Sequence, residues 1–357
     1  MKVCIIGASI TSLTLAKALV NQNIYIDLLT ENKNYRPDLS RTIGISKSNI
    51  DFFNKNIINI NKIIWRLNKI EIFSENLKKE KLLHFDDGKE IFSILKNFKL
   101  FDLLNKTLLK SKFFKKIYFK KKISNLEKYD LIINTDSSSS ITKKFFSKKI
   151  VKKYYSTAYT TIIKHEKISN DTATQIFSKK GPLAFLPISE TQTSIVFSLT
   201  DLSSKKKENI SELINQYNFK YKIKEITKIK SFKLKSMILK SYFHDNILAF
   251  GDLLHRIHPL AGQGFNMTIR DINILLKIIK KRHDLGLHLD KSVNYEFQKL
   301  TRHKNLIFST GVDFVYEFFN LEKKIKNDSL SKSVKFLGEI PAVKNLFTQI
   351  ADKGIVI

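Results

Sequence analysis

An aspartate, two histidines and a glycine-rich turn occur together in residues 250–266, which read F-G-D-L-L-H-R-I-H-P-L-A-G-Q-G-F-N. The apolar run just before them predicts a buried strand that carries Asp252 at its carboxyl end. The pattern from about Asn266 predicts a helix, and the free amides and positive dipole at its N-terminus favour negative charge. Glycines let a flat ligand approach the backbone closely. The segment therefore suits an electron-rich ring, with Asp252 binding a ribityl or ribose hydroxyl.

The two histidines also raise the question of a metal. His255 and His258 are three residues apart, and such a pair could contribute to a metal site. No nearby Cys, Asp or Glu completes a ligand set except Asp252, which the ring-binding interpretation already uses. We therefore predict no metal site. One histidine is expected to pack structurally and the other to line the ligand pocket.

The elements that must position this segment begin at the N-terminus. Residues 2–7 predict a buried parallel strand, 10–20 a helix and 24–29 a second strand. This β-α-β order is the core of a dinucleotide-binding fold. Further along the chain, the sequence predicts a loop and then a helix (41–60), strands and turns with a hairpin signal at Asp87-Gly88 (63–95), a helix (98–111), a strand (129–134), an antiparallel sheet (154–200), a short helix (208–217), strand (226–242) and helices broken at Gly338 and Pro341 (290–350).

Composition limits the class of protein. A chain of 357 residues with 43% hydrophobic and 27% charged residues suits one or two ordinary globular domains. No apolar run is long enough for a membrane span, and no signal peptide is expected. The single cysteine excludes an internal disulfide and fits a reducing compartment. The net charge of +30 is spread along the chain, which predicts a generic basic surface rather than specific nucleic-acid binding. An anionic membrane surface remains an alternative partner.

The segment 250–266 resembles the second flavin motif of the flavin-dependent aromatic hydroxylases, GD-x-x-H-x-x-H-P-x-A-G-Q-G-x-N in the ubiquinone-biosynthesis branch. A second stretch, 177–187, resembles that branch's F-x-x-x-G-P-x-A-x-L-P segment. The chain is thus similar to 2-polyprenylphenol hydroxylases over nearly its whole length. The resemblance implies FAD as the cofactor, and flavin contacts at Asp252, Pro259, Gly262, Gln263, Gly264, Phe265 and Asn266.

The family's other nucleotide motifs are altered in this chain. The first fingerprint, G-x-G-x-x-G, keeps only Gly7, and small residues, Ser9 and Ser12, replace the other glycines. The acidic position that binds adenosine ribose falls on Thr30, so either Glu31 shifts in by one residue or that contact is lost. Arg41, in a segment that reaches the cofactor in this family, is a candidate flavin or phosphate contact.

The family motif D-G-x-x-S-x-x-R is also altered here. Asp136 and Ser140 match its Asp and Ser, and Ser137 replaces its Gly. Lys143 keeps the charge of the family's arginine but loses the bidentate fork. Asp136 is the cofactor contact that we predict from this motif.

The implied fold is α/β, with a Rossmann-like FAD-binding domain interleaved with an antiparallel-sheet substrate domain. We assign residues 1–62, 95–150 and 243–285 to the FAD-binding domain, 63–94 and 151–242 to the sheet that covers the substrate, and 286–357 to a C-terminal helical segment. The implied activity is hydroxylation of a polyprenylated phenol on the way to ubiquinone through a C4a-hydroperoxyflavin, with NAD(P)H and O2 as co-substrates. No catalytic base can be named from the sequence.

Two alternatives to the enzyme remain. The altered motifs also suit a weakened flavoprotein that acts as a partner in a quinone-biosynthesis complex, and the charge alone suits a basic binding module on a relic flavin fold. The expected location is cytoplasmic, with peripheral attachment to the inner face of the cytoplasmic membrane as a second option.

Overall fold

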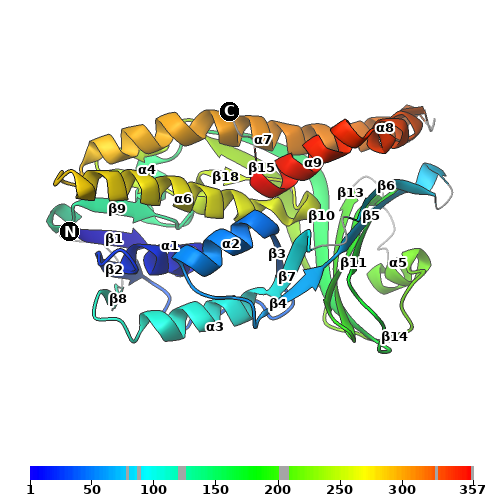
Figure 1. Ribbon diagram of the computed structural model, residues 1–357, viewed down its shortest axis with the longest axis horizontal. Helices are drawn as coiled ribbons and strands as arrows, with labels where there is room; N and C mark the ends of the chain where they lie inside the picture. Colours follow the sequence, from blue (N-terminus) through cyan, green and yellow to red (C-terminus); the bar gives the residue numbers. More distant parts are fainter. Residues whose placement is uncertain (78–79, 87–89, 120–125, 201–208, 326–328, 355–357) are drawn as a thin grey trace.

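The computed structural model describes residues 1–357 apart from 78–79, 87–89, 120–125, 201–208, 326–328 and 355–357. The predicted hairpin signal at Asp87-Gly88 lies outside the described residues. Helices and a small parallel sheet make up one part of the molecule, and a large curved sheet makes up the other (Figure 1).

The parallel sheet of the first part has six strands. Their order across the sheet is β16 (Phe243–His244), β17 (Ile247–Ala249), β9 (Leu131–Asn134), β1 (Lys2–Ile6), β2 (Tyr25–Thr30) and β8 (Phe114–Tyr118). All neighbouring pairs are parallel except β16 with β17. β1, β9 and β17 are buried along almost their whole length, as expected of strands covered on both faces. Strands that are far apart in the sequence thus lie side by side.

Helices pack with this sheet in the first part of the molecule. They are α1 (Ile10–Val20), α2 (Lys47–Asn56), α3 (Asn97–Leu108), α4 (Ser140–Phe145) and α6 (Gln263–Asp284). α1 packs on α3 and on α6. One continuous apolar core joins the sheet to these helices. The predicted β-α-β unit is present, with its strand and helix bounds within one residue of the predicted ones.

A small antiparallel sheet connects the two parts and includes a strand that the sequence reading missed. It contains β3 (Thr42–Ser46), β7 (Phe92–Lys96) and β4 (Ile64–Leu67), in that order. We expected residues 41–60 to form a loop and then a helix. Instead Thr42–Ser46 pair along their whole length with β7, and Ile43 and Ile45 are buried. Because a five-residue strand gains its partner about fifty residues later, local pattern alone gave a weak signal for it.

The large sheet has nine strands. They are β18 (His255–Arg256), β15 (Lys230–Leu239), β10 (Lys149–His165), β13 (Gln192–Thr200), β12 (Gly181–Ser189), β11 (Thr172–Ser178), β5 (Lys69–Ser74) and β6 (Lys81–Asp86) in order, with β14 (Ile223–Ile226) also paired to β10. α5 (Ile210–Tyr217) packs with a second apolar core on this sheet. Gly181 has φ +140°, and a Cβ there would lie 1.8 Å from the Ser198 carbonyl oxygen, so the turn between β11 and β12 requires glycine.

The C-terminal helices are α7 (Lys291–Ile325), α8 (Ser329–Glu339) and α9 (Pro341–Lys353). The predicted break at Gly338 and Pro341 falls at the boundary between α8 and α9, whereas the end of α7 at Ile325 was not predicted. α7 runs along α6 and also contacts the edge strands β16 and β17 of the parallel sheet (Figure 1). Among the described residues, no helix combines the length and apolar character that a membrane crossing requires.

The end of α9 is fastened to the start of α2. The Asp352 carboxylate accepts a hydrogen bond of 2.8 Å from the Ser48 amide, and the Asp352 carbonyl accepts hydrogen bonds from the Ser46 and Ser48 hydroxyls. Arg270 of α6 also donates to the Asp352 carbonyl, at 3.4 Å. The C-terminal helix thus holds β3, α2 and α6 together beside the glycine-rich turn.

Candidate flavin site

The carboxyl ends of the central strands meet at one edge of the parallel sheet. Ile6 at the end of β1 is in register with Leu29 of β2 and with Asn134 of β9, and Asn134 is in register with Ala249 of β17. The segments that follow these strands contain the predicted cofactor residues. In open α/β sheets, ligands bind at this edge.

The first of these segments, Gly7 to Ser12, is a compact turn into α1. Gly7 has φ +131°, and a Cβ there would lie 2.3 Å from the Thr135 hydroxyl oxygen, so no other residue fits without movement. Ser9 caps α1, because its hydroxyl accepts a hydrogen bond from the Ser12 amide. The Ser12 hydroxyl is buried and pairs with that of Thr135 at 2.7 Å. The serine hydroxyls therefore support the turn, and backbone amides of the first turn are what this helix offers to a phosphate.

The end of β2 contains Thr30, which occupies the family's acidic position, and Glu31, which would have to shift in by one residue to replace it. Thr30 ends β2 and is buried, and its hydroxyl accepts a hydrogen bond from the Asn32 amide at 3.2 Å. Glu31 follows and is exposed. Asp27 lies within the strand, where Lys2 at 2.9 Å and the Tyr129 hydroxyl at 2.8 Å bind its carboxylate. Glu31 is thus the only one of these carboxylates that faces solvent, and its ribose contact stays a prediction.

Asp136 and Arg41 have protein partners of their own. The Asp136 carboxylate accepts hydrogen bonds from the amide and hydroxyl of Ser138, at 2.8 and 2.6 Å. Ser139, rather than the matched Ser140, caps the short helix α4. Arg41 is exposed before β3, and its guanidinium lies 5.9 Å from the centre of the Phe232 ring. The flavin contacts of Asp136 and Arg41 stay predictions.

The second flavin segment reaches the first one through Gly251. This residue has φ +65°, and a Cβ there would lie 2.5 Å from the Thr11 methyl group. The close approach places Asp252, which is exposed, beside the first turn of α1. The two sequence motifs, about 240 residues apart, are therefore neighbours at the edge of the sheet.

The glycine-rich turn comes next and begins α6. Gly262 is in the left-handed region, with φ +64°, and its Cβ position lies 3.5 Å from the Gly44 backbone of β3. Gly264 has open space around its Cβ position. Pro259 and Phe265 are half-buried, and Gln263 is buried, with its side-chain oxygen 3.4 Å from the Arg270 guanidinium. The first turn of α6 thus offers amides beside an opening at Gly264.

Asn266 has a structural role that the motif did not reveal. Its carboxamide oxygen accepts hydrogen bonds from the Ser46 amide and the Asn49 side chain, both at 3.0 Å. Its nitrogen donates to the carbonyl oxygens of Gly44 at 3.1 Å and Gly262 at 3.4 Å. The residue is fully buried. Asn266 therefore joins β3 and α2 to the glycine-rich turn.

Replacing Asn266 with alanine is expected to lower the free energy of unfolding by about 2–4 kcal/mol, since each buried group left without a partner costs about 1–3 kcal/mol. Urea unfolding followed by circular dichroism measures this loss. The matched control is Asn61→Ala. The exposed Asn61 side-chain oxygen accepts hydrogen bonds from the Asn54 side-chain amide at 3.1 Å and the Arg66 guanidinium at 3.3 Å, and its removal should change stability by less than about 0.5 kcal/mol. Equal midpoints for the two variants would contradict the assigned role.

The two histidines of the segment have different surroundings. His255 Nε2 lies 2.7 Å from the Asp271 carboxylate, which also accepts hydrogen bonds from Asn305 at 3.2 and 3.3 Å. His258 lies between the rings of Tyr154 and Tyr316, with ring centres 4.9 and 4.4 Å away. Neither His258 nitrogen has a hydrogen-bond partner among the described residues. Burial lowers the pKa of His258 to about 3.

The neutral, buried His258 predicts a pH dependence of stability. In the unfolded chain this histidine binds a proton near pH 6.5, whereas the folded protein binds it only near pH 3. Because the unfolded state then holds more protons, the free energy of unfolding should fall as the pH drops through this window. His258→Phe keeps a flat ring and should show a shallower fall between pH 6.5 and 4. Identical pH profiles for the two proteins would show that His258 does not cause the loss.

The residues at this edge fit a bound FAD. Two helices, α1 and α6, begin here, and the close contact at Gly251 brings Asp252 next to α1. A side chain at Gly7 would collide with Thr135, and the positive φ of Gly262 disfavours any residue other than glycine. The Cβ position of Gly264 is open. Two amide-rich helix starts suit a pyrophosphate and an electron-rich ring, respectively. Among the residues that the structure describes, no group of three His, Cys, Asp or Glu side chains is arranged for a metal ion.

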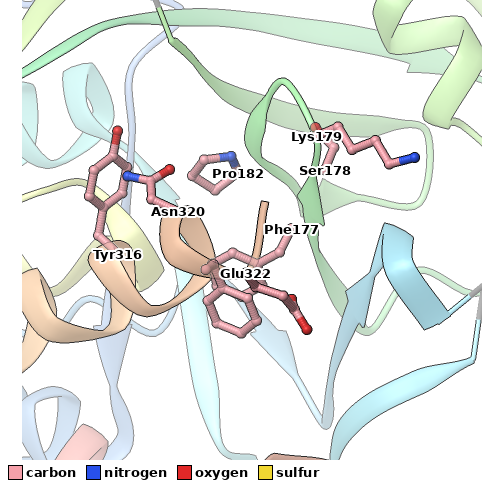
Figure 2. Close-up of a pocket in the computed structure, with 8 residues that line it drawn as sticks. Phe177, Ser178, Lys179, Pro182, Tyr316, Asn320 and Glu322 are labelled. Atoms are coloured by element: carbon pink, nitrogen blue, oxygen red, sulfur yellow. The ribbon is translucent and has the colours of Figure 1, made fainter. Parts of the chain in front are cut away.

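A small pocket lies between α7 and the β11–β12 turn. Figure 2 shows Tyr316 and Asn320 on one side of it and Pro182 on the other. Its volume is about 10 Å³, room for about one water molecule. Phe177 and Phe319 stack there with ring centres 3.6 Å apart. Since Tyr316 also stacks on His258, this aromatic layer connects the predicted substrate-covering turn to the flavin segment.

The fold and the site together define a flavoprotein of the Rossmann-like type. Residues 152–282 match the family model described as an FAD binding domain. p-Nitrophenol 4-monooxygenase from Pseudomonas putida has the same fold, with a TM-score of 0.80 at 11% identity over 99% of this chain and 98% of that one. HpxO from Klebsiella pneumoniae, solved with FAD and uric acid, gives a TM-score of 0.76 at 12% identity over 99% and 97%.

Curated relatives narrow the comparison. A mitochondrial ubiquinone biosynthesis monooxygenase, COQ6, from Drosophila melanogaster is 22% identical over 260 residues, 61% of this chain and 54% of the relative. The 3-demethoxyubiquinol 3-hydroxylase of Escherichia coli is 27% identical over 157 residues, 42% and 40% of the two chains. The matched part thus spans about half the length of these relatives. The resemblance inferred from the flavin motifs, the α/β fold and FAD as the cofactor are confirmed.

Some residues that hold the site together were not predicted from the sequence. Asp271, Thr135 and Asn49 each bind a residue of the flavin segments. Only Asp271 had a local signal, because a carboxylate on the apolar face of a predicted helix requires a buried partner. The partners of Thr135 and Asn49 come from distant segments, so the sequence could not reveal them.

Proposed function

We propose that this protein is an FAD-dependent monooxygenase that hydroxylates the aromatic ring of a polyprenylated phenol in ubiquinone biosynthesis through a C4a-hydroperoxyflavin. The observation that carries the proposal is the meeting of two helix N-termini, Asp252 and the open Gly264 at one edge of the parallel sheet. The names of the curated relatives support the pathway. FAD would supply the redox chemistry, with NAD(P)H as electron donor and O2 as oxidant.

Groups of the chain itself would bind and orient FAD and would shield the site from water. The first-turn amides of α1 would hold the pyrophosphate, and those of α6 would stabilise negative charge on the ring system. Asp252 would accept a hydrogen bond from a ribityl hydroxyl. The buried aromatic layer of Tyr154, Tyr316 and His258 would exclude water from the side where the substrate ring enters.

The test is reconstitution with FAD followed by an assay with a polyprenylated phenol, NADH or NADPH, and O2. A flavin spectrum near one FAD per chain, pyridine-nucleotide oxidation that depends on the phenol, and one 18O atom in the product from 18O2 are the expected results. Protein that takes up no FAD under any condition would refute the proposal. Bound FAD without oxygen incorporation would refute the activity alone.

A second candidate function is that of a flavoprotein partner in a quinone-biosynthesis complex. It is favoured by the local use of Asp136 and Ser12, whose side chains serve the protein's own turns, and by Lys143 in place of arginine. In a strain that lacks the gene, the partner role predicts rescue of ubiquinone synthesis by a variant that cannot bind FAD. The enzyme role predicts no rescue.

The net positive charge of the chain supports a further part of the proposal, namely association with an anionic membrane surface. With a net charge of +30, the protein would associate with anionic lipid at the inner face of the cytoplasmic membrane, where a lipid-tailed substrate resides. Cosedimentation with vesicles that contain phosphatidylserine tests this. Binding should fall steeply as salt is raised, since screening weakens attraction between exposed charges. No binding at low salt would refute the membrane association.

A further inference from the structure

The strands β10 and β15 form an antiparallel ladder that contains no acidic residue. Residues 137–165, which include β10, hold seven lysines and no Asp or Glu. Residues 226–244, which include β15, hold five lysines and again no Asp or Glu. The whole chain has 33 acidic residues in 357, so stretches of this length would ordinarily include a few. The ladder is therefore a local concentration of positive charge.

The lysines on one face of this ladder have no carboxylate to neutralise them. Lys153 of β10 lies directly opposite Lys235 of β15, and both are exposed. Like charges directly across a ladder destabilise it. Lys152, on the other face of β10, bonds Glu317 at 3.0 Å, whereas among the described residues Lys149, Lys153 and Lys235 have no ion-pair partner. An anion from outside the chain would offset this unfavourable charge.

Exposed apolar side chains lie between these lysines. Ile150, Val151 and Tyr155 are 56%, 43% and 69% exposed. Because successive side chains of a strand point to opposite faces, Lys149, Val151 and Lys153 share one face of β10. We name a β10 patch, which consists of Lys149, Val151, Lys153, Tyr155 and Lys235.

The backbone at Tyr155 has an unusual conformation. Its φ is +49°, in the left-handed region that bulky residues rarely adopt. The residue lies in a bulge, since the register of β10 against β15 shifts there. Its neighbours Tyr154 and Ser156 are buried and contact Tyr316 of the aromatic layer. Strained backbone of this kind occurs most often where the residue has a function, and here it accompanies an exposed tyrosine.

Protection of an open strand edge is the simplest alternative explanation for the lysines. β10 pairs with β15 along its first half and with β13 only from Ser156 onward, so the first half lies at an edge. Charged side chains at such edges prevent pairing with other chains. That role does not account for Ile150, Val151 and Tyr155, because exposed apolar side chains at an edge favour such pairing. The patch therefore requires a partner that takes both kinds of side chain.

An anionic bilayer suits this mixture better than a nucleic acid does. Single-stranded nucleic acid is bound without sequence preference by aromatic side chains on which successive bases stack. The β10 patch instead combines a single ring, that of Tyr155, with the aliphatic Val151. At the surface of an anionic bilayer, lysines meet lipid phosphates while tyrosine rings and aliphatic side chains enter the headgroup region.

We propose that the β10 patch docks the protein on an anionic phospholipid bilayer. Its lysines meet the lipid phosphates, and Val151 and Tyr155 enter the headgroup region. This inference rests on the membrane association proposed above and assigns it to one surface. Tyr154, which precedes Tyr155, contacts the His258 ring of the flavin segment. The bilayer would thus lie against the strand that also contributes to the aromatic layer.

Vesicle cosedimentation of the full chain with bound FAD tests the assignment. Lys149→Ser/Lys153→Ser should weaken binding to vesicles that contain phosphatidylserine by about 25-fold, since each lysine near an anionic surface contributes about fivefold. The matched control, Lys106→Ser/Lys110→Ser, removes the same charge from exposed lysines at the end of α3 and should weaken binding by less than about threefold. Tyr155→Asn suits the positive φ and should weaken binding without loss of stability.

A fluorescent label tests the contact with lipid directly. Cys4 is the single cysteine and is buried, so the thiol of Val151→Cys is the reactive one. An environment-sensitive dye at this position should shift its emission to the blue with phosphatidylserine vesicles, and lipids that carry a nitroxide should quench it. A dye at Leu285→Cys, exposed at the end of α6, should show neither change.

The outcomes separate this assignment from the proposals on which it rests. No vesicle binding by the natural protein at low salt refutes the membrane association and the assignment together. Binding that Lys149→Ser/Lys153→Ser and its control lose equally refutes the assignment alone. A dye at Val151→Cys that responds to single-stranded DNA but not to vesicles also refutes it, in favour of a nucleic-acid surface. FAD uptake and oxygen incorporation are measured without vesicles, so the monooxygenase proposal is judged independently.

Discussion

A leucine in place of Gly264 is expected to weaken FAD binding by about a hundredfold or more. A hundredfold loss corresponds to about 2.8 kcal/mol, which is within the range of about 1–3 kcal/mol for overpacking. Gly264 lies in the first turn of α6, in the segment whose amides would face the ring system, and its Cβ position is open. The side chain would therefore fill space that the flavin needs. Fluorescence titration of the apoprotein with FAD measures the loss.

Stability serves as the control for this substitution. Gly264 is helical without a positive φ, and leucine is favoured over glycine within helices by roughly 0.5–1 kcal/mol, so the apoprotein should unfold no more easily than the natural chain. Gly264→Ala adds only one methyl group and should have a smaller effect on FAD affinity. If the leucine variant binds FAD as tightly as the natural protein, the open side of Gly264 does not face the cofactor.

Asp271→Ala is expected to have the largest effect on folding, with a loss of about 3–5 kcal/mol in the free energy of unfolding. Asp271 and His255 form a hydrogen-bonded pair at 2.7 Å with both side chains almost fully buried. Removal of the carboxylate leaves His255 Nε2 and the Asn305 amide without their partner. Because this pair joins α6 to β18, and Asn305 connects it to α7, several elements should loosen together. Urea unfolding gives the measurement.

Two comparisons separate this effect from a general loss of charge. Asp284→Ala removes a carboxylate from the exposed Lys280–Asp284 pair on the same helix, and it should leave the unfolding midpoint nearly unchanged. Asp271→Asn keeps an oxygen that can accept a hydrogen bond and should recover part of the loss. An Asp271→Ala protein that unfolds at the same urea concentration as Asp284→Ala would show that the buried pair contributes little.

The local hydrophobic pattern was sufficient to predict the elements whose apolar residues repeat with a single period. The first strand, helix and strand were predictable because an unbroken apolar run, then helical spacing, then a second run occur within thirty residues. The strand β8 was not predicted. Its residues Phe114–Tyr118 include two lysines and are only partly buried, and the strand exists because it pairs with β2, about ninety residues earlier. Pairing of that kind leaves little local trace.

Part of the candidate site was also predictable from the sequence. Gly7 and Asp252 were both assigned to the flavin site from their motifs, and they lie at the same edge of the sheet because both follow parallel strands. The role of Asn266 could not be predicted, because its four hydrogen bonds lead to groups on β3, α2 and the glycine-rich turn. A motif records which residue recurs at a position, but here the reason for the residue lies in contacts across more than two hundred positions.

The attachment of Asp352 to Ser48 has a consequence for the order in which the protein can be made. The two residues are 304 positions apart, so at about 5–20 residues per second a ribosome needs roughly 15 to 60 seconds between them. During that time the amide and hydroxyl of Ser48 depend on water. The edge of the FAD-binding region therefore gains these hydrogen bonds only after the last helix has been synthesised. A chain that stalls or is cut before residue 352 lacks them, which leaves this edge accessible to quality-control proteases.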